Sequence, residues 1–565
     1  MRCQAATLVV SQAEPLRPNC SRGDAILFLQ VFNDMLLVAI DPAGCRDDQR
    51  LPGWRPPFWA EVSGCPEKGC AKIWEIRRAA LNRLSAFALR YAGLIRALLI
   101  AVPVLFSAVS ATAGQNDDAP ADPPAPRMLV LVLDGVPFRV VEAARERGAF
   151  AGWPQTLPMV STFPSMTNVA FAALLRPLGE TAVPGYELRH FDHERNRIVK
   201  ADGFAWKDRF QVISHTKSAK AGVYITTRKK IRRDMTKVEK LALESPSELM
   251  LAHVAATDTL THFRGDGAIT DLVVQLAERI DALRRAHLER FERPLRIYLL
   301  SDHGNTAGSK VRTPSGVGKL LRGAGLNPAK RLEGPDDVVA VTYGIVGYGV
   351  LFLDPSRAEV AARAMLGHPG VNLAAWVSDQ HTLRVVGDEG EALVRWRHRS
   401  GRLELAHRAT RGDPLRLADA ERGMAAAGKF DPDGFASEAD WFEATALGDY
   451  PAAPIRLVRS LDGSWVTNVA TVIVSFAPGY AWGIRSAQLG AWFRGGKLEA
   501  THGGLDRGST WGFYLKSDGP MPSGPAVAAH LALAELSDLA SGADPALLGP
   551  GCDRSPLHAV RLFLP

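Results

Sequence analysis

The stretch MLVLVLDG at residues 128–135 is the most informative about the fold. Its first six residues are all apolar, a pattern typical of a central strand in a parallel sheet that helices cover on both faces. Asp134 follows that strand directly. Ligands of open α/β sheets bind at the carboxyl ends of strands, so Asp134 is a candidate site residue. By itself an Asp-Gly pair is also a common turn.

Further apolar runs extend this pattern. Those at 296–300, 344–353 and 470–475 each predict a buried strand. An amphipathic helix is predicted from apolar residues spaced by three and four, namely Ile269, Leu272, Val273, Leu276, Ile280 and Leu283. Alternating strands and helices predict an α/β sheet with helices on both faces. Residues 381–470 begin with an alternating stretch cut by turns, which indicates a β-meander and is interpreted as an inserted β-rich cap.

Carboxylates and histidines recur at informative places. Asp302 and His303 directly follow an apolar strand, Asp258 and His262 are spaced D-x-x-x-H, and His502 lies in THGG. The D-x-x-x-H spacing puts both side chains on one side of a helix. A buried carboxylate is costly unless a cation compensates its charge, which favours a metal. The alternatives are a solvent-facing pair at a helix start and a histidine in a surface loop.

A hydroxyl-rich turn precedes an apolar helix that is expected from Val169 onward. Thr162 lies in this turn, close to the free backbone N–H groups of the helix start, which bind anions such as phosphate. The alternative is that the hydroxyls and amide here, including Ser165, Thr167 and Asn168, only cap the helix.

The order of these motifs resembles the alkaline phosphatase superfamily, and within it the type I phosphodiesterases and nucleotide pyrophosphatases. The resemblance covers about 128–310 and 469–520. It implies a three-layer alkaline-phosphatase-like sandwich with a central, mostly parallel sheet, helices on both faces and an inserted β-rich cap. It also implies hydrolysis of a small-molecule phosphate ester with two divalent metal ions, which the family has as zinc. Mixed carboxylate and imidazole ligands suit zinc or manganese better than magnesium or calcium.

The resemblance implies a role for each motif residue. One metal would be held by Asp134, Thr162, Asp302 and His303, and the other by Asp258, His262 and His502. Thr162, in the turn Thr-Phe-Pro, resembles the family's nucleophile, which forms a phosphothreonine intermediate.

The sequence departs from the family pattern in two places. Ser165 stands where the family usually has Asn, and 182–187 stands where an HGIxGN segment usually supplies an Asn to the phosphoryl oxygen. Tyr186 could donate a hydrogen bond to substrate instead, whereas Glu187 would repel a phosphoryl dianion. A sulfatase is disfavoured because the sequence has no C/S-x-P-x-R signature.

Three other functions remain open. A phosphomonoesterase or phosphotransferase would use the same site with extra cations such as Lys217 and Lys220, and an inactive metal-binding envelope protein would keep only the fold. Nucleic-acid binding is the weakest alternative. The basic cluster at 228–233 has no interleaved aromatic residues and no reader motif, so it is interpreted as a solvated loop whose charge would steer anionic substrates.

Composition restricts the protein class further. With 565 residues, 47% of them hydrophobic and 22% charged, the chain as a whole is neither disordered, collagenous nor a coiled coil. Residues 1–113 contribute 13 basic and 9 acidic side chains to the net charge of +7, so the basic balance is largely N-terminal. Five of the six cysteines lie within residues 1–70, which leaves Cys552 without an internal partner in the rest of the chain.

The N-terminal part indicates export. Residues 77–113 contain an arginine-rich stretch, an uncharged apolar stretch and a final A-x-A site, as in a secretory signal peptide or, alternatively, a membrane anchor. Residues 1–76 are interpreted as the product of a mis-assigned start or as a leader, and 114–127 as a linker. The catalytic core is expected at 128–380 and 471–565. It would be periplasmic or secreted, or membrane-anchored outside the cytoplasm, with membrane contact only if the segment is retained.

Overall fold

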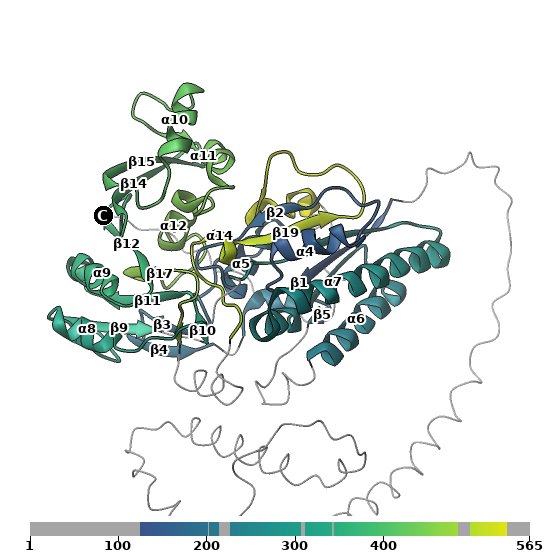
Figure 1. The fold of residues 1–565 in the computed structure, drawn as a ribbon, viewed down its shortest axis with the longest axis horizontal. Coiled ribbons are helices and arrows are strands. Elements are labelled where there is room, and N and C mark those ends of the chain that lie inside the picture. Colours follow the sequence, from purple (N-terminus) through teal and green to yellow (C-terminus); the bar gives the residue numbers. More distant parts are fainter. Residues whose placement is uncertain are drawn as a thin grey trace, which may run out of the picture. The chain divides into compact units, whose positions relative to one another are not determined.

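A computed structural model provides the fold (Figure 1), and it describes residues 125–201, 203–213, 227–306, 311–341, 344–483 and 498–538. The expected leader and signal segment, most of the linker, and Lys217, Lys220 and Cys552 lie outside these residues. Within the described ranges, no helix is both long enough and apolar enough to span a bilayer.

The central sheet has seven strands in the order β20-β2-β19-β7-β1-β6-β5. Only β19 runs antiparallel to its neighbours. The predicted runs at 128–133 and 296–300 are the adjacent strands β1 and β7, which confirms a mostly parallel central sheet. The strands are β1 (Arg127–Leu133), β2 (Leu157–Val160), β5 (Val212–Ile213), β6 (Leu249–Val254), β7 (Leu295–Leu300), β19 (Trp511–Lys516) and β20 (Val527–Ala528).

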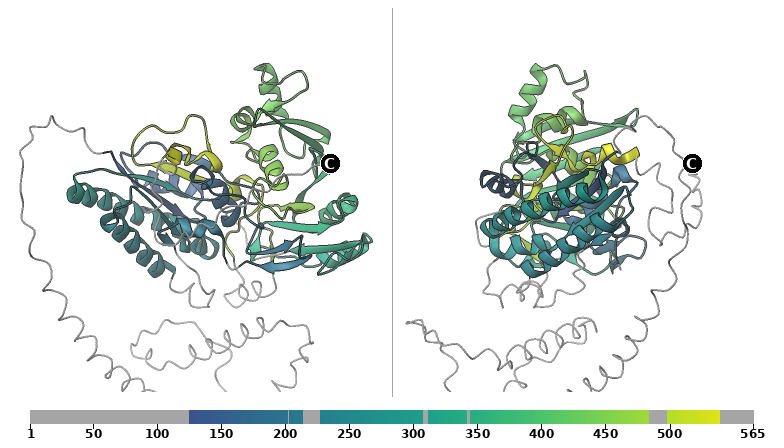
Figure 2. Two further views of the ribbon diagram at one scale, coloured as in Figure 1. Left: turned by 180° about the vertical axis from the view of Figure 1, so that it is seen from behind. Right: turned by 90° about the vertical axis from the view of Figure 1, so that its right-hand side faces the viewer.

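Both faces of this sheet are covered, as predicted. On one face Leu129 and Leu131 of β1 pack in a core with α4 (Phe138–Glu146), α6 (Thr227–Glu244) and α7 (Ala256–Phe291). On the other, Val130 and Val132 pack in a core that includes α5 (Thr167–Leu174). Figures 1 and 2 show α6 and α7 lying side by side along the sheet. The predicted apolar face at 269–283 is buried on α7, beyond an interruption at Gly265.

A second sheet of nine strands is antiparallel apart from the pairing of β8 with β9. Most of the apolar runs at 344–353 and 470–475, expected in the same sheet as β1, lies here instead, while Ile345–Val346 pair with Trp482–Gly483 in a separate two-stranded sheet. A strand buried on both faces is apolar throughout whether its neighbours are parallel or antiparallel, so the pattern could not separate the two sheets. The strands are β8 (Asn327–Pro328), β9 (Asp337–Val341), β11 (Tyr348–Leu353), β12 (Val371–Asp379), β13 (Thr382–Gly387), β14 (Gly390–Arg399), β15 (Arg402–Gly412), β16 (Ala436–Ser437) and β17 (Val472–Phe476).

One face of the second sheet contributes to the core shared with the central sheet, and the other packs against α8 (Val317–Gly323) and α9 (Ala358–Leu366). The predicted β-meander is present as β13, β14 and β15. The expected cap boundary at 380–381 falls between β12 and β13, which pair as neighbours in this sheet. The segment 381–470 also contains the helix α12 (Ala453–Leu461), which packs into the shared core.

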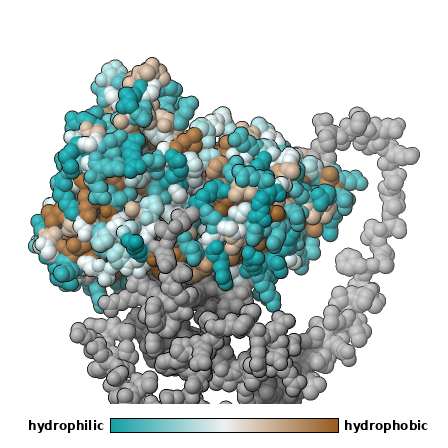
Figure 3. Space-filling model, viewed as in Figure 1, coloured by the Kyte–Doolittle hydropathy of each residue, from teal (hydrophilic) through white to brown (hydrophobic). Residues whose placement is uncertain are grey.

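The basic cluster at 228–233 lies in the first turns of α6 rather than in a loop. Ile231 is buried there while Arg228, Lys229, Arg232 and Arg233 are exposed, so the cluster is the solvent side of an amphipathic helix. The molecular face in Figure 3 is mostly hydrophilic, with scattered hydrophobic areas.

Candidate metal centre

The predicted acidic and histidine residues all reach one edge of the central sheet. Asp134 directly follows β1, Asp302 and His303 follow β7, and the first turns of α7, just after β6, carry Asp258 and His262. These strands are parallel, so their carboxyl ends share an edge. Because β19 is antiparallel, the segment that precedes it meets the same edge, and it brings His502 there.

The six residues form two adjoining groups of three. Asp134, Asp302 and His303 make one group and Asp258, His262 and His502 the other, each with its ligand atoms within 4.8 Å of one another. The rings of His303 and His502 stack with centroids 3.9 Å apart, so the two groups are neighbours. This grouping coincides with the two ligand sets that the sequence resemblance implied, apart from the threonine.

Each histidine is oriented by a backbone carbonyl. The Nδ1 atoms of His262, His303 and His502 lie 2.7, 2.9 and 2.8 Å from the carbonyl oxygens of Ala500, Gly304 and Ser165. A carbonyl only accepts, so Nδ1 carries the proton in each ring. The Nε2 atom with its lone pair therefore faces the centre, which is the arrangement of metal-binding histidines.

Without a cation these inward lone pairs would face carboxylate oxygens. His303 Nε2 lies 3.5 Å from Asp302 Oδ2, and His502 Nε2 lies 3.8 Å from Asp258 Oδ1. Burial lowers the pKa of His303, and that of His502 to about 3, so neither ring gains a second proton at neutral pH. Asp302 Oδ2 is buried and has no hydrogen-bond partner among the described residues.

Two of the three carboxylates show the same deficit of positive charge, whereas the charges of His262 and His502 lower the pKa of Asp258 against the effect of burial. Burial, reinforced by the charges of Asp302 and Asp258, raises the pKa of Asp134 well above its usual range. Burial and the Asp258 charge raise the pKa of Asp302 to about 7. A divalent cation in each group would neutralise the carboxylates and accept the Nε2 lone pairs, so the residues fit a metal.

The hydroxyl beside this centre belongs to Thr167 and not to Thr162, which was expected there. Thr162 is buried, and its hydroxyl donates to Pro164 O at 3.0 Å within its own turn. Thr167 Oγ1 instead lies 3.4 Å from Asp134 Oδ1 and 3.3 Å from His303 Nε2. Both threonines precede apolar residues in one hydroxyl-rich stretch, and only the path of the chain shows which one reaches the ligands.

The start of α5 also differs from the prediction. The helix begins at Thr167, two residues earlier than expected, and no side chain caps it. The expected capping groups have other partners. Ser165 Oγ donates to backbone carbonyls, and Asn168 Nδ2 donates to Glu187 Oε2 at 2.6 Å. The uncapped first N–H groups of α5 leave an anion-favouring helix end beside the metal centre.

His253 belongs to the site and was missed in the sequence. It pairs in register with Val132 of β1, and its Nε2 lies 2.9 Å from Asp134 Oδ2. Burial lowers its pKa to about 3, so the neutral ring donates Nε2–H to the carboxylate. A carboxylate held in this way turns its other oxygen, Oδ1, toward the centre. A polar residue near the carboxyl end of the apolar strand LMLAHV was the available signal.

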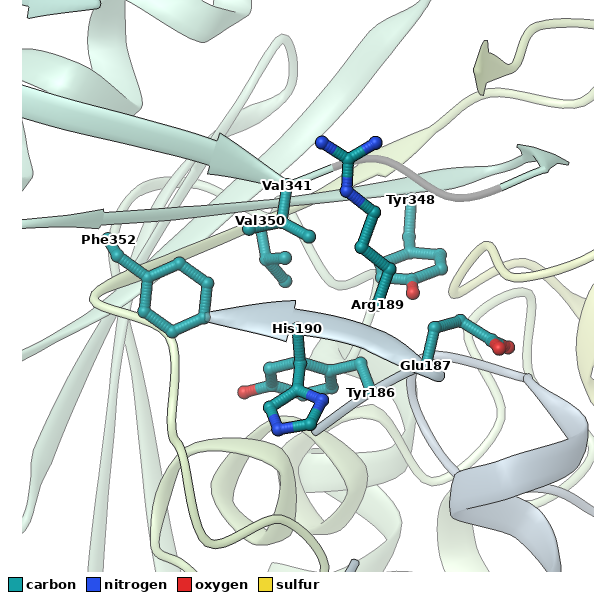
Figure 4. Close-up of a pocket in the computed structure, with 8 residues that line it drawn as sticks. All are labelled: Tyr186, Glu187, Arg189, His190, Val341, Tyr348, Val350 and Phe352. Carbon is teal, nitrogen blue, oxygen red and sulfur yellow. The ribbon is translucent and has the colours of Figure 1, made fainter. Parts of the chain in front are cut away.

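Tyr186 and Glu187 lie in a neighbouring pocket (Figure 4), where their side chains point in opposite directions. The Tyr186 hydroxyl donates to Ser460 O at 2.8 Å, which leaves it no proton to donate to a substrate. Burial raises the pKa of Glu187 to about 8, against the effect of its donors Leu188 and Asn168.

No protein-family model matches this sequence, and no curated protein matches it. Among solved structures, human ectonucleotide pyrophosphatase / phosphodiesterase 5 is 11% identical, with a TM-score of 0.40 over 74% of this chain and 95% of its own. Phosphonoacetate hydrolase from Sinorhizobium meliloti 1021, in complex with phosphonoformate, is 12% identical, with a TM-score of 0.41 over 74% and 96%. The first carries the name of the family that the sequence resembles. At these identities and TM-scores, neither similarity by itself transfers a fold or an activity to this chain.

Proposed function

We propose that this protein is a phosphoric ester hydrolase that uses two divalent cations and a threonine nucleophile. The observation that carries the proposal is the pair of adjoining Asp/His groups, in which each histidine Nδ1 bonds a backbone carbonyl and His303 Nε2 lies 3.3 Å from the Thr167 hydroxyl. Mixed carboxylate and imidazole ligands favour zinc over magnesium or calcium.

Each group of three would hold one ion. Asp134, Asp302 and His303 would bind the ion nearer to Thr167, and the second ion would be bound by Asp258, His262 and His502. When bound, such a pair of cations stabilises the attacking and leaving oxygens of an in-line phosphoryl displacement and lowers the pKa of a hydroxyl. His253 keeps Asp134 in its binding orientation.

Thr167 supplies the nucleophile. Its Oγ1 attacks phosphorus, the bond to the leaving alcohol breaks, and a phosphothreonine forms. The hydroxyl proton has an acceptor in Asp134 Oδ1, 3.4 Å away. The N-terminal end of α5 favours the negative phosphoryl group. Water then cleaves the phosphothreonine, which releases phosphate or a phosphomonoester and restores the hydroxyl.

The test is hydrolysis of bis(p-nitrophenyl) phosphate before chelation, after chelation and after zinc is restored. We expect activity to be lost and then regained, and His502→Ala to be inactive while the exposed His398→Ala behaves as wild type. Hydrolysis that survives complete removal of metal would overturn the proposal. The same assay with p-nitrophenyl phosphate separates a phosphodiesterase from a phosphomonoesterase. Metal binding without turnover of either ester would indicate the inactive alternative.

We also infer, from the sequence alone, that the catalytic part acts outside the cytoplasm. Cleavage after Ala113 would leave a mature chain that starts at Gly114. N-terminal sequencing of the exported protein tests this, and an intact 77–113 segment in the membrane fraction would support the anchor instead.

A further inference from the structure

Arg456, on α12, is a buried cation with no carboxylate paired to it among the described residues. Its side chain is 2% exposed, and burial lowers its pKa to about 9, with the charge of Asp506 acting against that shift. Burying a guanidinium is costly unless hydrogen bonds and charge compensate it. The contacts that Arg456 makes are therefore informative.

The guanidinium joins three separate parts of the chain. Nη2 donates to Thr162 O at 2.8 Å and to Ser165 Oγ at 3.0 Å. Nη1 donates to Pro451 O and to Leu505 O, each at 3.1 Å. Four hydrogen bonds from one planar group fix the relative positions of these segments, which a lysine ammonium could not do with the same geometry.

Two of these segments lead directly into the metal centre. The carbonyl of Ser165 accepts the Nδ1–H of His502, and α5 starts two residues later at Thr167. Leu505 lies three residues after His502 on the other segment. The guanidinium thus holds, on both sides, the backbone that orients a predicted metal ligand and the predicted nucleophile.

We propose that Arg456 is a positioning residue that sets the orientation of His502 and Thr167, a role that rests on the proposed function. It acts through Ser165 and touches neither the metal ligands nor the reacting hydroxyl. Through it, the segment 381–470, which contributes none of the predicted ligands, reaches the active centre. The Ser460 hydroxyl of the same helix donates to Phe163 O, so the turn stays attached to α12 without the guanidinium. Loss of Arg456 is therefore expected to loosen the site geometry more than the fold.

A purely structural role predicts something different. If Arg456 only fills space in the core, its loss lowers stability without affecting one metal ion more than the other. If it positions His502, its loss lowers the metal affinity of the His502 group and leaves the metal affinity of the Asp134 group unchanged. Removal of a group that orients a ligand typically costs about 10–100-fold in metal affinity or activity.

The experiment compares Arg456→Met and Arg456→Lys with the control Arg459→Met. Arg459 lies on the same helix and makes an ion pair with Glu438, which is not among the predicted ligands, with Nε 2.8 Å from Oε1. Each metal-free protein is titrated with Co²⁺, whose visible spectrum reports ligand geometry, and its thermal unfolding is recorded. His502→Ala and His303→Ala identify which step of the titration belongs to which group.

We expect Arg456→Met to lower the Co²⁺ affinity of the His502 group by about 10–100-fold. This is the site that His502→Ala abolishes, and its Co²⁺ spectrum should change. The other ion should bind normally, Arg456→Lys should be intermediate, and Arg459→Met should match wild type. In the diester assay, kcat of Arg456→Met should fall with little change in KM. Two ions bound with wild-type affinity and spectrum by Arg456→Met would overturn the role of Arg456 alone. A wild-type chain that binds no metal would instead overturn the proposed function, and this role with it.

Discussion

Replacing Thr167 separates the two threonines that lie near the start of α5. The change Thr167→Ala removes the hydroxyl that lies 3.4 Å from Asp134 Oδ1 and 3.3 Å from His303 Nε2. The matched change Thr162→Ala removes a hydroxyl that bonds only within its own turn among the described residues. The two variants lose the same atoms, five residues apart, so they are a controlled pair.

The expected effects on stability are small in both variants. Thr167→Ala loses one long hydrogen bond, worth about 0.5–1 kcal/mol, and gains about 0.5 kcal/mol of helix propensity, so the free energy of unfolding hardly changes. Thr162→Ala loses a buried hydrogen bond at a cost of about 1 kcal/mol. The acceptor, Pro164 O, keeps its second donor, Met166 N at 2.9 Å.

The expected effects on catalysis differ strongly between the two variants. Without its nucleophile Thr167→Ala should lose at least ~10³-fold in kcat, about 4 kcal/mol of transition-state stabilisation, while keeping its metal ions. Thr162→Ala should stay within a few-fold of wild type. The assay is single-turnover hydrolysis of a phosphorus-labelled diester, quenched in acid to trap phosphothreonine on the chain. Labelled protein from Thr167→Ala, or its absence from wild type together with full activity of Thr167→Ala, would refute the assignment.

Three further perturbations probe the surroundings of the centre. His253→Gln removes the donor to Asp134 Oδ2, so the zinc affinity of the Asp134 group should fall by about 10-fold or more in a titration. An unchanged affinity would count against the role of His253. Gly135→Ala would place a Cβ 2.4 Å from Asp258 Oδ1, so the Asp258 group should lose its ion. The control Gly148→Ala is also at positive φ but faces open space, so it should cost only about 1–2 kcal/mol of stability. Glu187, with a folded pKa of about 8 against its ordinary value of 4.5, binds more protons in the folded state than in the unfolded one. Between these two values wild-type stability should therefore fall as pH rises, by up to about 1.4 kcal/mol per pH unit, and urea unfolding of Glu187→Gln should show a flatter dependence.

The convergence of the candidate ligands could be predicted because these residues follow a positional rule. Asp134 and Asp302 end apolar strands, and the carboxyl ends of parallel strands converge wherever the strands lie in the sheet. The spacing of Asp258 and His262 needed only a helix to bring the two together. His253 obeys the same positional rule, yet a single histidine inside an apolar strand does not stand out from an ordinary buried one.

The remaining features depend on contacts that local sequence does not encode. Thr162 and Thr167 share one hydroxyl-rich turn, and the direction of that turn is fixed by Arg456, almost three hundred residues away. The division into two sheets depends on which strands pair, and burial on both faces hides that information. In the sequence, residues 228–233 are interpreted as a loop because five of the six are basic. One buried residue, Ile231, is too few to show a helical pattern.

The number of metal ions bound per chain tests the central claim most directly. Purified protein, saturated with zinc and freed of excess metal, is analysed by mass spectrometry of the elements against protein concentration. Two ions per chain are predicted, falling to one in His502→Ala and in His303→Ala and remaining two in the exposed variant His398→Ala. Fewer than one ion per chain in the wild-type protein, or two ions that persist in both ligand variants, would contradict the two-metal centre.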